Sequence, residues 1–494
     1  MVSQRIRKWS VFLLYVVAFF ILGTRYAAPA WLLDVQSALG QTELGYRFAG
    51  WCLYGGSFFI GMIFGPYIKQ CVGEVYFTMA AFSSLPLSYL MIWLAIKNAH
   101  SPGISVLDYI GCLGLGFATG GCTSLSLATL GPLFGKNNMA TIIGTTQFVF
   151  SIGSIVSTHV LGMLSLETYF EVMTILAACL PIVAVATLYL KPPPPKPDAD
   201  AREKSGPPGS AVNVPPSYSD LLIRPVTVPC LLLVGSMFGF GTSLVTNLGP
   251  VCAAFDQTSP VEANIVVQTA AMGGRLCIVV VSKFYARYIQ QQEGSRLADA
   301  LPNPSILFNL LGSLAFLGSG IYILIETRHR APTREDLLAA FGIFGFFYGS
   351  LWSGLGPMTQ FIDNDPTIAP KILAMLAFCA GSFSIVYNLV IPSLLYTDGD
   401  YDVTGRPGMF FEVAVMWVVS AFSSVVFTLT ALLKKVEASG PFYPRMDSSM
   451  EIESPIYRGS NRDTIPPRSS ALGSGEHEDK EEFRDIARFS SSFG

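Results

Sequence analysis

Residues 263–282 read ANIVVQTAAMGGRLCIVVVS and contain one charged residue, Arg275. Twenty mostly apolar residues are enough for a helix that spans the hydrocarbon core of a bilayer. A charged side chain near the middle of such a helix costs about 2.5–3.5 kcal/mol on insertion scales, so it normally faces a polar cavity or a partner. The stretch therefore predicts a membrane protein with a polar pathway, in which Arg275 is a candidate contact for an anion.

The composition of the whole chain agrees with a membrane protein. Of its 494 residues, 51% are hydrophobic and 13% are charged, and the mean hydropathy is +0.49. Soluble domains usually carry about 25% charged residues. The nine cysteines lie mostly in apolar stretches, without the spacing of a metal site or a disulfide framework. The sequence also lacks phosphate-binding, metalloprotease and nucleophile-elbow motifs and a basic surface, so we expect no catalytic residue, metal, cofactor or nucleic-acid partner.

The hydrophobic pattern predicts an all-α membrane protein with twelve transmembrane helices in two groups of six, residues 9–190 and 227–434. A short N-terminal segment, residues 1–8, precedes them. The expected spans are 9–36, 45–68, 74–96, 104–131, 138–164, 168–190, 227–255, 261–289, 303–325, 335–361, 369–396 and 409–434.

Polar segments separate and follow the two groups. Residues 191–226 begin with a run of prolines and are rich in Ser and charge, and residues 435–494 are rich in Ser, Glu and Arg. Such segments cannot bury a core, so we expect a flexible linker and a disordered tail. In the linker, the sequence PPSY resembles a WW-domain ligand and overlaps YSDL, which resembles a tyrosine sorting signal. A partner of either kind would contact Pro215, Pro216 and Tyr218, and a chance match is the alternative.

Basic residues set the expected orientation. They are frequent in the segments that share a side with the N-terminus, such as Arg5, Lys69, Lys191 and Arg224, and rare on the other side. Because cytoplasmic loops carry an excess of Lys and Arg, we expect both termini, the linker and the tail to be cytoplasmic. The expected location is the plasma membrane or an endomembrane.

The two groups of helices resemble each other at a nearly constant offset. The pair GT at 23–24 matches GT at 241–242, and GG at 55–56 matches GG at 273–274. Internal repeats joined by a linker are typical of transporters in which one half rocks against the other. The sequence therefore predicts two six-helix pseudo-repeats.

Four regions in and between the spans also resemble one known family. The first, from span one to span two, contains Tyr26 and Pro29, LGQTEL (39–44) and LYGGSFFIG (53–61), and the others are FGKNNMATIIG (134–144), GTSLVTNLGPV (241–251) and GGRL (273–276). With them the chain resembles the major facilitator superfamily, and more narrowly its nodulin-like and monocarboxylate-carrier-like branches. The resemblance implies the major facilitator fold and an organic-anion site at the arginine of GGRL.

The chain departs from that pattern at four places. The loop of residues 65–73, GPYIKQCVG, contains Lys69 but no acid, whereas the superfamily usually has one there. Met139 stands where nodulin-like proteins tend to have arginine. Ala30 and Ala271 stand where monocarboxylate carriers have a lysine and an aspartate that take part in proton coupling. The resemblance therefore implies an anion site without the same proton-coupling groups.

Arg275 has two interpretations. Its planar guanidinium can bind a carboxylate bidentately. Alternatively it forms a structural ion pair, or lies nearer the cytoplasmic end and reaches the interface. About 20 Å of helix separates Arg275 from Glu262 at the outer end, which is too deep for easy access outward. We favour substrate binding.

Arg25, in span one, is a second candidate for substrate binding. It is expected to line an outer basic vestibule that attracts an anion. The alternative is a salt bridge to Asp34 or Glu43 at the membrane surface.

Asn247 and Gln268 are candidates for polar contacts with the substrate. Asn247 precedes Gly249 and Pro250, which should interrupt span seven and free backbone carbonyls for a ligand or for the asparagine itself. Gln268 lies two turns before Arg275 on the same face of span eight, as a cavity contact or as an interhelical hydrogen bond. The acids Asp108, Glu171 and Glu412 lie near span ends, so we expect them at the interface and find no convincing buried proton carrier.

We therefore expect a secondary active transporter of a small organic anion, of monocarboxylate type, that works by alternating access with a proton or another ion as the coupled species. An amino acid transporter of the same fold is an alternative, because Arg275 would hold an α-carboxylate equally well. The long linker and tail leave a third interpretation open, a membrane receptor or scaffold that transports nothing.

Overall fold

The computed structural model describes residues 4–191, 217–255, 258–291, 304–329, 333–363, 368–395 and 407–438. These residues form helices and no strand, and they belong to one compact unit, residues 1–440. Linker residues 192–216, with Pro215 and Pro216, lie outside the described residues, as do residues 439–494 of the expected tail. The first four residues of that tail, 435–438, are helical and not disordered as expected, because they continue the last span.

Residues 4–191 make the first half of the unit. Its elements are α1 (Gln4–Gly23), η1 (Thr24–Ala27), α2 (Ala28–Ala38), α3 (Glu43–Gly55), η2 (Gly56–Ile63), α4 (Gly65–Val72), α5 (Glu74–Lys97), α6 (Ser105–Met163), α7 (Leu166–Ala177) and α8 (Leu180–Leu190). η1 is a 3₁₀ turn and η2 a π-helix, so the first two spans both contain irregular turns.

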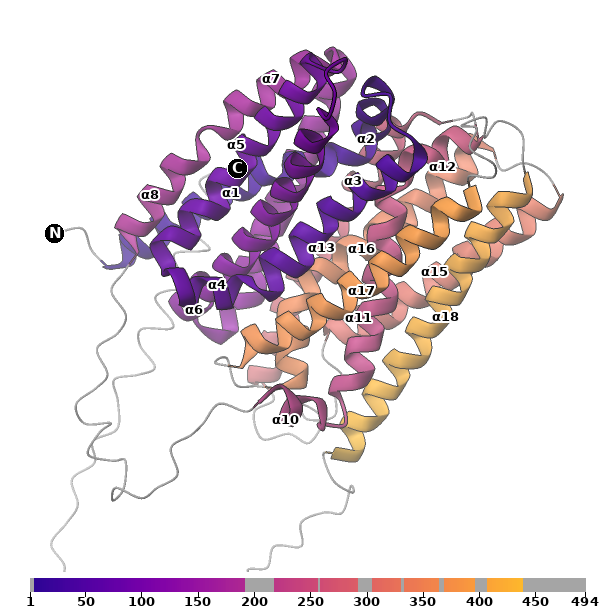
Figure 1. Ribbon diagram of the computed structural model, residues 1–494. Coiled ribbons are helices and arrows are strands. Elements are labelled where there is room, and N and C mark those ends of the chain that lie inside the picture. Colours follow the sequence, from indigo (N-terminus) through magenta and orange to yellow (C-terminus); the bar gives the residue numbers. More distant parts are fainter. Residues whose placement is uncertain are drawn as a thin grey trace, which may run out of the picture. The chain divides into compact units, whose positions relative to one another are not determined.

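Residues 217–438 make the second half, and its helices pack beside those of the first (Figure 1). Its elements are α10 (Tyr218–Leu222), α11 (Thr227–Thr246), α12 (Leu248–Phe255), α13 (Pro260–Gln291), α15 (Pro304–His329), α16 (Arg334–Ile362), α17 (Ala369–Leu395) and α18 (Pro407–Ala438). Contacts of α13 with α6 and of α17 with η2 join the two halves.

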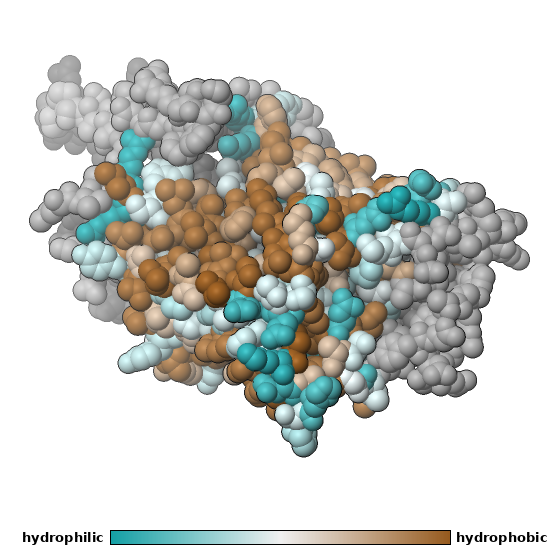
Figure 2. Space-filling view, turned by 90° about the horizontal axis from the view of Figure 1, so that it is seen from above, coloured by the Kyte–Doolittle hydropathy of each residue, from teal (hydrophilic) through white to brown (hydrophobic). Residues whose placement is uncertain are grey.

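The helices match the expected spans. Eleven in the described part of the chain are long and apolar enough to cross a membrane, and a bent pair, residues 44–63 and 65–72 at 57°, adds a twelfth. Large apolar side chains such as Ile182 (72% exposed) and Phe422 (58%) point outward. Figure 2 shows a face on which hydrophobic residues predominate, with hydrophilic groups toward its margins. A bilayer would cover such a surface, and the prediction of an all-α membrane protein is confirmed.

Helix α6 differs from the expected pattern, because it runs for 59 residues through the segment where a loop was expected between spans four and five. A straight helix of that length would measure about 88 Å, roughly three times the hydrocarbon core. Its two apolar stretches, residues 105–131 and 141–163, are separate candidate spans. They therefore count as two spans, and the residues between them, 132–140, have helical backbone where a loop was expected.

Glycines bring helices into backbone contact at matching places in the two halves. A Cβ atom on Gly56 would lie 2.2 Å from the carbonyl oxygen of Leu113 in α6. A Cβ atom on Gly274 would lie 1.8 Å from that of Phe346 in α16. Both positions are the second glycine of the GG pairs that align in the sequence, so the two halves use the same packing device.

The last part of the expected flexible linker is helical instead. Ser217 and Asp220 form a capping box at the start of α10, and Leu221 is buried. The hydrogen bonds from the Ser217 hydroxyl and backbone N–H lower the pKa of the Asp220 carboxyl. The cap and the buried leucine offset the chain entropy that composition alone predicted to dominate.

Helix α10 is attached to the rest of the second half by charged residues. Arg224, just after it, forms an ion pair with Asp363 at the end of α16. The amine of Lys371 in α17 lies 5.8 Å from the centre of the Tyr218 ring.

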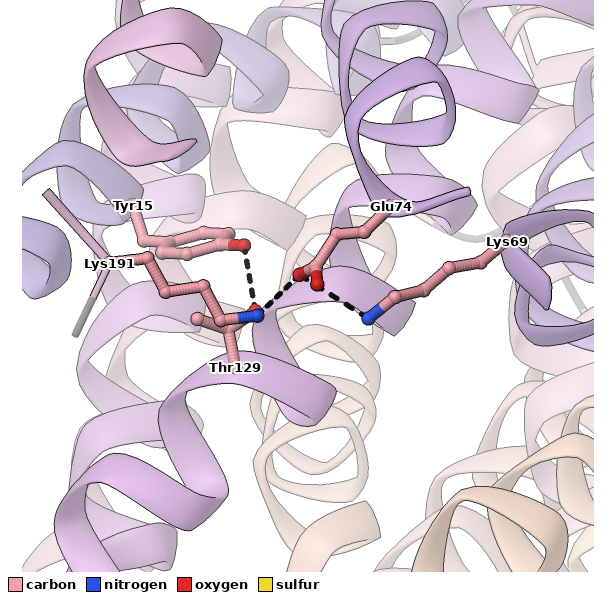
Figure 3. A network of polar contacts seen from close by, with 5 residues as sticks. All are labelled: Tyr15, Lys69, Glu74, Thr129 and Lys191. Atoms are coloured by element: carbon pink, nitrogen blue, oxygen red, sulfur yellow. Dashed lines mark hydrogen bonds and ion pairs between the residues drawn. The ribbon is translucent and has the colours of Figure 1, made fainter. Parts of the chain in front are cut away.

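A polar network closes the corner between α4 and α5 (Figure 3). Glu74, the first residue of α5, pairs with Lys69 at 3.4 Å and with Lys191, which follows α8. Beside them the Tyr15 hydroxyl donates to Thr129 at 3.4 Å. The acid that residues 65–73 lack is therefore present immediately after the loop.

Replacing Gly274 with alanine is expected to destabilise the protein, because the new methyl group would overlap the Phe346 carbonyl. The neighbouring Gly273 is a matched control, since a Cβ atom there would be 3.7 Å from its nearest neighbour. Gly274→Ala should lose about 1–3 kcal/mol through overpacking, whereas Gly273→Ala should be neutral or gain up to about 1 kcal/mol of helix propensity. Thermal unfolding of the two purified variants compares them, and equal midpoints would contradict the close contact.

Candidate functional site

Arg275 is buried at the contact between the two halves, with 1% of its surface exposed. Its Nη1 atom donates to the Gln147 carbonyl at 2.7 Å and to the Ser151 hydroxyl, both on α6. Its guanidinium carbon lies 5.5 Å from the centre of the Phe150 ring. The described residues provide it with no carboxylate partner, and its Nε atom has no hydrogen-bond partner among them. The ion-pair alternative therefore finds no acid in this part of the chain.

A polar seam runs along the contact of α13 with α6. At its other end the Asn264 amide donates to the Thr158 hydroxyl at 2.9 Å and to the Tyr26 carbonyl at 2.8 Å. Between the two contacts lie Gln268 on α13 and Ser154 on α6, both buried. The Oε1 atom of Gln268 and the Oγ atom of Ser154 lack partners among the described residues. Unsatisfied buried polar atoms cost about 1–3 kcal/mol each, so the seam is suited to water or a polar ligand.

Arg25 lies inside the unit and not at its surface, with 1% exposure. Pro29 has no N–H for the carbonyl of residue 25, and that carbonyl instead accepts a 3₁₀-type bond from Ala28. The resulting turn, η1, directs Arg25 to the Ser57 hydroxyl and the Leu53 carbonyl, each at 3.2 Å. The prediction that Arg25 lines an outer vestibule is therefore wrong, because its side chain is buried inside the protein. Its alternative fails as well, because Arg25 forms no ion pair with Asp34 or any other acid in the described residues.

An aromatic pair connects the two arginines. The Arg25 guanidinium lies 5.5 Å from the centre of the Tyr26 ring, and Tyr26 packs edge-to-face on Phe150 at 5.0 Å. Phe150 in turn lies under Arg275. Tyr54 adds a second ring at 5.2 Å from Arg25. Ring faces stabilise the buried cations without neutralising them.

Further aromatic residues continue from this pair into the second half. Tyr54 stacks with Phe58, which stacks on Trp352 of α16. The phenols of Tyr26 and Tyr54 lie within electrostatic range of Tyr348, also on α16. The two cations therefore adjoin a layer of aromatic side chains contributed by both halves.

Asn247 occupies the break between α11 and α12. Its amide donates to the Ser243 carbonyl at 2.8 Å and to the Asn388 side chain at 3.0 Å, and Ser243 also donates to Asn388. The Asn247 side chain thus supplies hydrogen bonds at the break in the helix and is not left free for a ligand. Because Pro250 lacks an N–H, the Thr246 carbonyl is free and accepts the Tyr46 hydroxyl of α3 at 2.7 Å. The broken span therefore also binds the opposite half.

The structure brings Arg275 and Gln268 to the contact between the halves, places Arg25 beside them within the first half, and places Asn247 in a network within the second half. Sequence reasoning missed Asn264 and Ser151. The spacing of Asn264, Gln268 and Arg275 along one helix face was the available signal. Asp108 lies near the start of its span, as expected, but it is fully buried (0% exposed), because α2 and α3 cover the start of α6.

Comparisons with known proteins agree with this architecture. Residues 11–366 match the family model described as Major Facilitator Superfamily. Among solved structures, the chain is similar to the crystal structure of a D-xylose-proton symporter, with a TM-score of 0.55 and 13% sequence identity over 85% of this chain and 97% of the other. No curated protein matches the chain.

The family model extends over most of the chain, and the similar structure has the same fold at a sequence identity that supports the fold alone. The twelve candidate spans and the contact between two halves are as that fold requires. The chain is therefore a multi-pass membrane protein that belongs to the major facilitator superfamily.

Proposed function

We propose that this member of the superfamily is a secondary active transporter of a small organic anion, which binds between the halves at Arg275 and Arg25. The observation that carries the proposal is the burial of two guanidinium groups without a carboxylate partner in the described residues, Arg275 at that contact and Arg25 next to it in the first half. A buried charge is stable only when it is paired or well hydrogen-bonded. Carbonyls, hydroxyls and rings solvate these two cations but leave their charge uncompensated.

The free hydrogen-bonding groups favour a carboxylate. The Nε atoms of both arginines lack acceptors in the described residues. A carboxylate can accept two parallel hydrogen bonds from a guanidinium, which gives orientation as well as energy. Gln268 and Ser154 would serve the polar groups on the rest of a small substrate, and the aromatic layer its apolar part. These features support a monocarboxylate-like substrate.

Two alternatives have less support. An amino acid would place its carboxylate in the same way, but its ammonium group would need an acid, and the described residues of the seam contain none. The symporter of similar fold is named for D-xylose. A neutral sugar would leave both cations uncompensated.

Alternating access requires that contacts between the halves break and re-form. The contacts on this chain suit such a cycle, because they are single hydrogen bonds and ring contacts, such as Tyr46 to Thr246 and Asn264 to Tyr26. Within each half, by contrast, glycines such as Gly56 and Gly274 hold helices at backbone contact. Each half is therefore suited to move as a rigid body, with both termini and the linker on the cytoplasmic side.

Uptake by Arg275 variants tests the proposed site. Arg275→Ala should reduce uptake of radiolabelled lactate or pyruvate into proteoliposomes about ten- to hundredfold, because a charge-assisted hydrogen bond of about 1.5–3 kcal/mol is lost. Arg275→Lys should recover part of the rate, since it keeps the charge but not the planar fork. Arg5→Ala, at an exposed position at the start of α1, is the control. Uptake at the control rate in both Arg275 variants, at equal protein levels, would remove Arg275 from the site.

A disulfide across the halves tests alternating access. A Cβ atom on Gly249 of α12 would lie 3.5 Å from the Cβ atom of Leu33 in α2, within the range for a disulfide. The double variant Leu33→Cys/Gly249→Cys should lose uptake on oxidation and recover it on reduction. The two single variants control for the native cysteines. Full uptake by the oxidised double variant, with the cross-link verified by mass spectrometry, would contradict a cycle in which this contact opens.

A further inference from the structure

Asp108 is a buried carboxylate that the proposed site does not use. Among the described residues, three charged side chains are almost completely buried: Arg25, Arg275 and Asp108. Asp108 is fully covered, yet its partners are neutral. Its Oδ2 atom accepts the Gln36 amide N–H of α2 at 2.7 Å, and its Oδ1 atom lies 3.8 Å from the Cys112 sulfur. A buried carboxylate without a cation favours its neutral, protonated form.

The Gln36 side chain is arranged to serve that protonated form. Gln36 is 1% exposed, and its Oε1 atom is buried without a hydrogen-bond partner in the described residues. Its amide N–H already donates to Asp108. If Asp108 gains a proton, its O–H becomes a hydrogen-bond donor. The Oε1 atom of the same Gln36 amide can then accept that hydrogen bond. One amide can therefore satisfy both states of the carboxyl group.

The groups that face Asp108 from neighbouring helices do not neutralise it. Cys112 and Tyr109 lie on its own helix, and Cys52 of α3 lies within electrostatic range. The Tyr109 hydroxyl is engaged by Gln41 at 2.6 Å. At the end of α5, Lys97 stacks 4.7 Å above the Trp93 ring. No lysine, arginine or histidine in the described residues bonds the carboxyl group.

Asp108 lies near Arg25 through the contact of α6 with α3. Gly116, two turns along α6 from Asp108, packs on the Leu53 carbonyl so closely that a Cβ atom there would lie 2.0 Å from the oxygen, and that carbonyl accepts from Arg25. About 12 Å of helix therefore separates Asp108 from the level of Arg25. In this poorly solvated region the charge of Asp108 weakens the attraction of Arg25 for an anion. Protonation removes that opposing charge.

We propose that Asp108 is a proton-binding site whose protonation strengthens anion binding at Arg25, so that a proton and an anion bind together. The proton comes from water, binds a carboxylate oxygen and leaves the same way, and no covalent bond of the substrate changes. By linkage, the anion must equally favour protonation of Asp108. The second half of the proposal rests on the proposed anion transport, whereas the proton site itself does not.

Infrared spectroscopy tests the proton site without any substrate. pH-difference spectra of the purified full-length protein should contain the carbonyl stretch of a protonated carboxyl group, which Asp108→Asn removes. Asp34→Asn, the same change at an exposed acid of α2, should leave it in place. Gln36→Leu removes the hydrogen-bonding partner that the amide offers to both states, so the band should move to the higher frequency of a carboxyl group without an acceptor. A carboxyl band that is identical in Asp108→Asn and the wild type, or a band whose frequency Gln36→Leu leaves unmoved, overturns the site.

Anion binding tests the linkage. Lactate, measured by calorimetry across pH, should bind the wild type at least about fivefold more tightly at low pH, the lower limit typical of coupled sites. Asp108→Asn imitates the protonated form, so it should bind tightly at every pH, and Asp34→Asn should behave as the wild type. An unchanged pH dependence in Asp108→Asn overturns the linkage. Failure of the proposed anion function has a different signature: lactate and pyruvate bind at no pH, while the infrared band still decides the proton site.

Discussion

The structure depends on one constraint, the need to keep two arginine side chains charged inside a low-dielectric protein. Arg25 and Arg275 receive carbonyl and hydroxyl acceptors and aromatic faces in place of carboxylates. Irregular backbone makes this possible, because the 3₁₀ turn before Pro29 directs Arg25 inward next to the π-helix η2. The price is an interior with excess positive charge and several unsatisfied polar atoms. Such an interior is costly for stability and useful for binding.

Much of the fold could be predicted from the sequence, because hydrophobic length is a local property. Twelve apolar stretches and a GG pair in each half were sufficient for the span count and for the place of Gly56 and Gly274. The continuous helix α6 was not foreseen, since glycines and polar residues at 131–138 are typical of a loop. Helix α10 was not expected, because the Pro, Ser and charged residues of the linker are typical of a flexible segment. Its composition does not show the capping box that Ser217 and Asp220 form.

The candidate site was less predictable, because its contacts join residues far apart in the chain. The acids nearest to Arg25 in the sequence, Asp34 and Glu43, were its expected ion-pair partners. The turn in span one instead directs its side chain to Ser57. Asp108 lies three residues from the start of its helix, which is typical of an interfacial residue, yet the packing of α2 buries it. Arg275 could be singled out because its desolvation cost depends on the residues beside it in the sequence. Its acceptors, Gln147 and Ser151, could not.

Pro250 has a consequence for how readily the two halves separate. In an unbroken helix the Thr246 carbonyl would be satisfied by the N–H four residues later, but proline has none, so the acceptor is left for Tyr46 of the other half. Pro250, which interrupts span seven, thereby allows a hydrogen bond between span seven and the other half. Whenever the halves part here, the carbonyl loses its donor and must be hydrated, so opening at this contact and entry of water become the same event. The missing N–H of one residue thus contributes to the free-energy cost of separating the two halves.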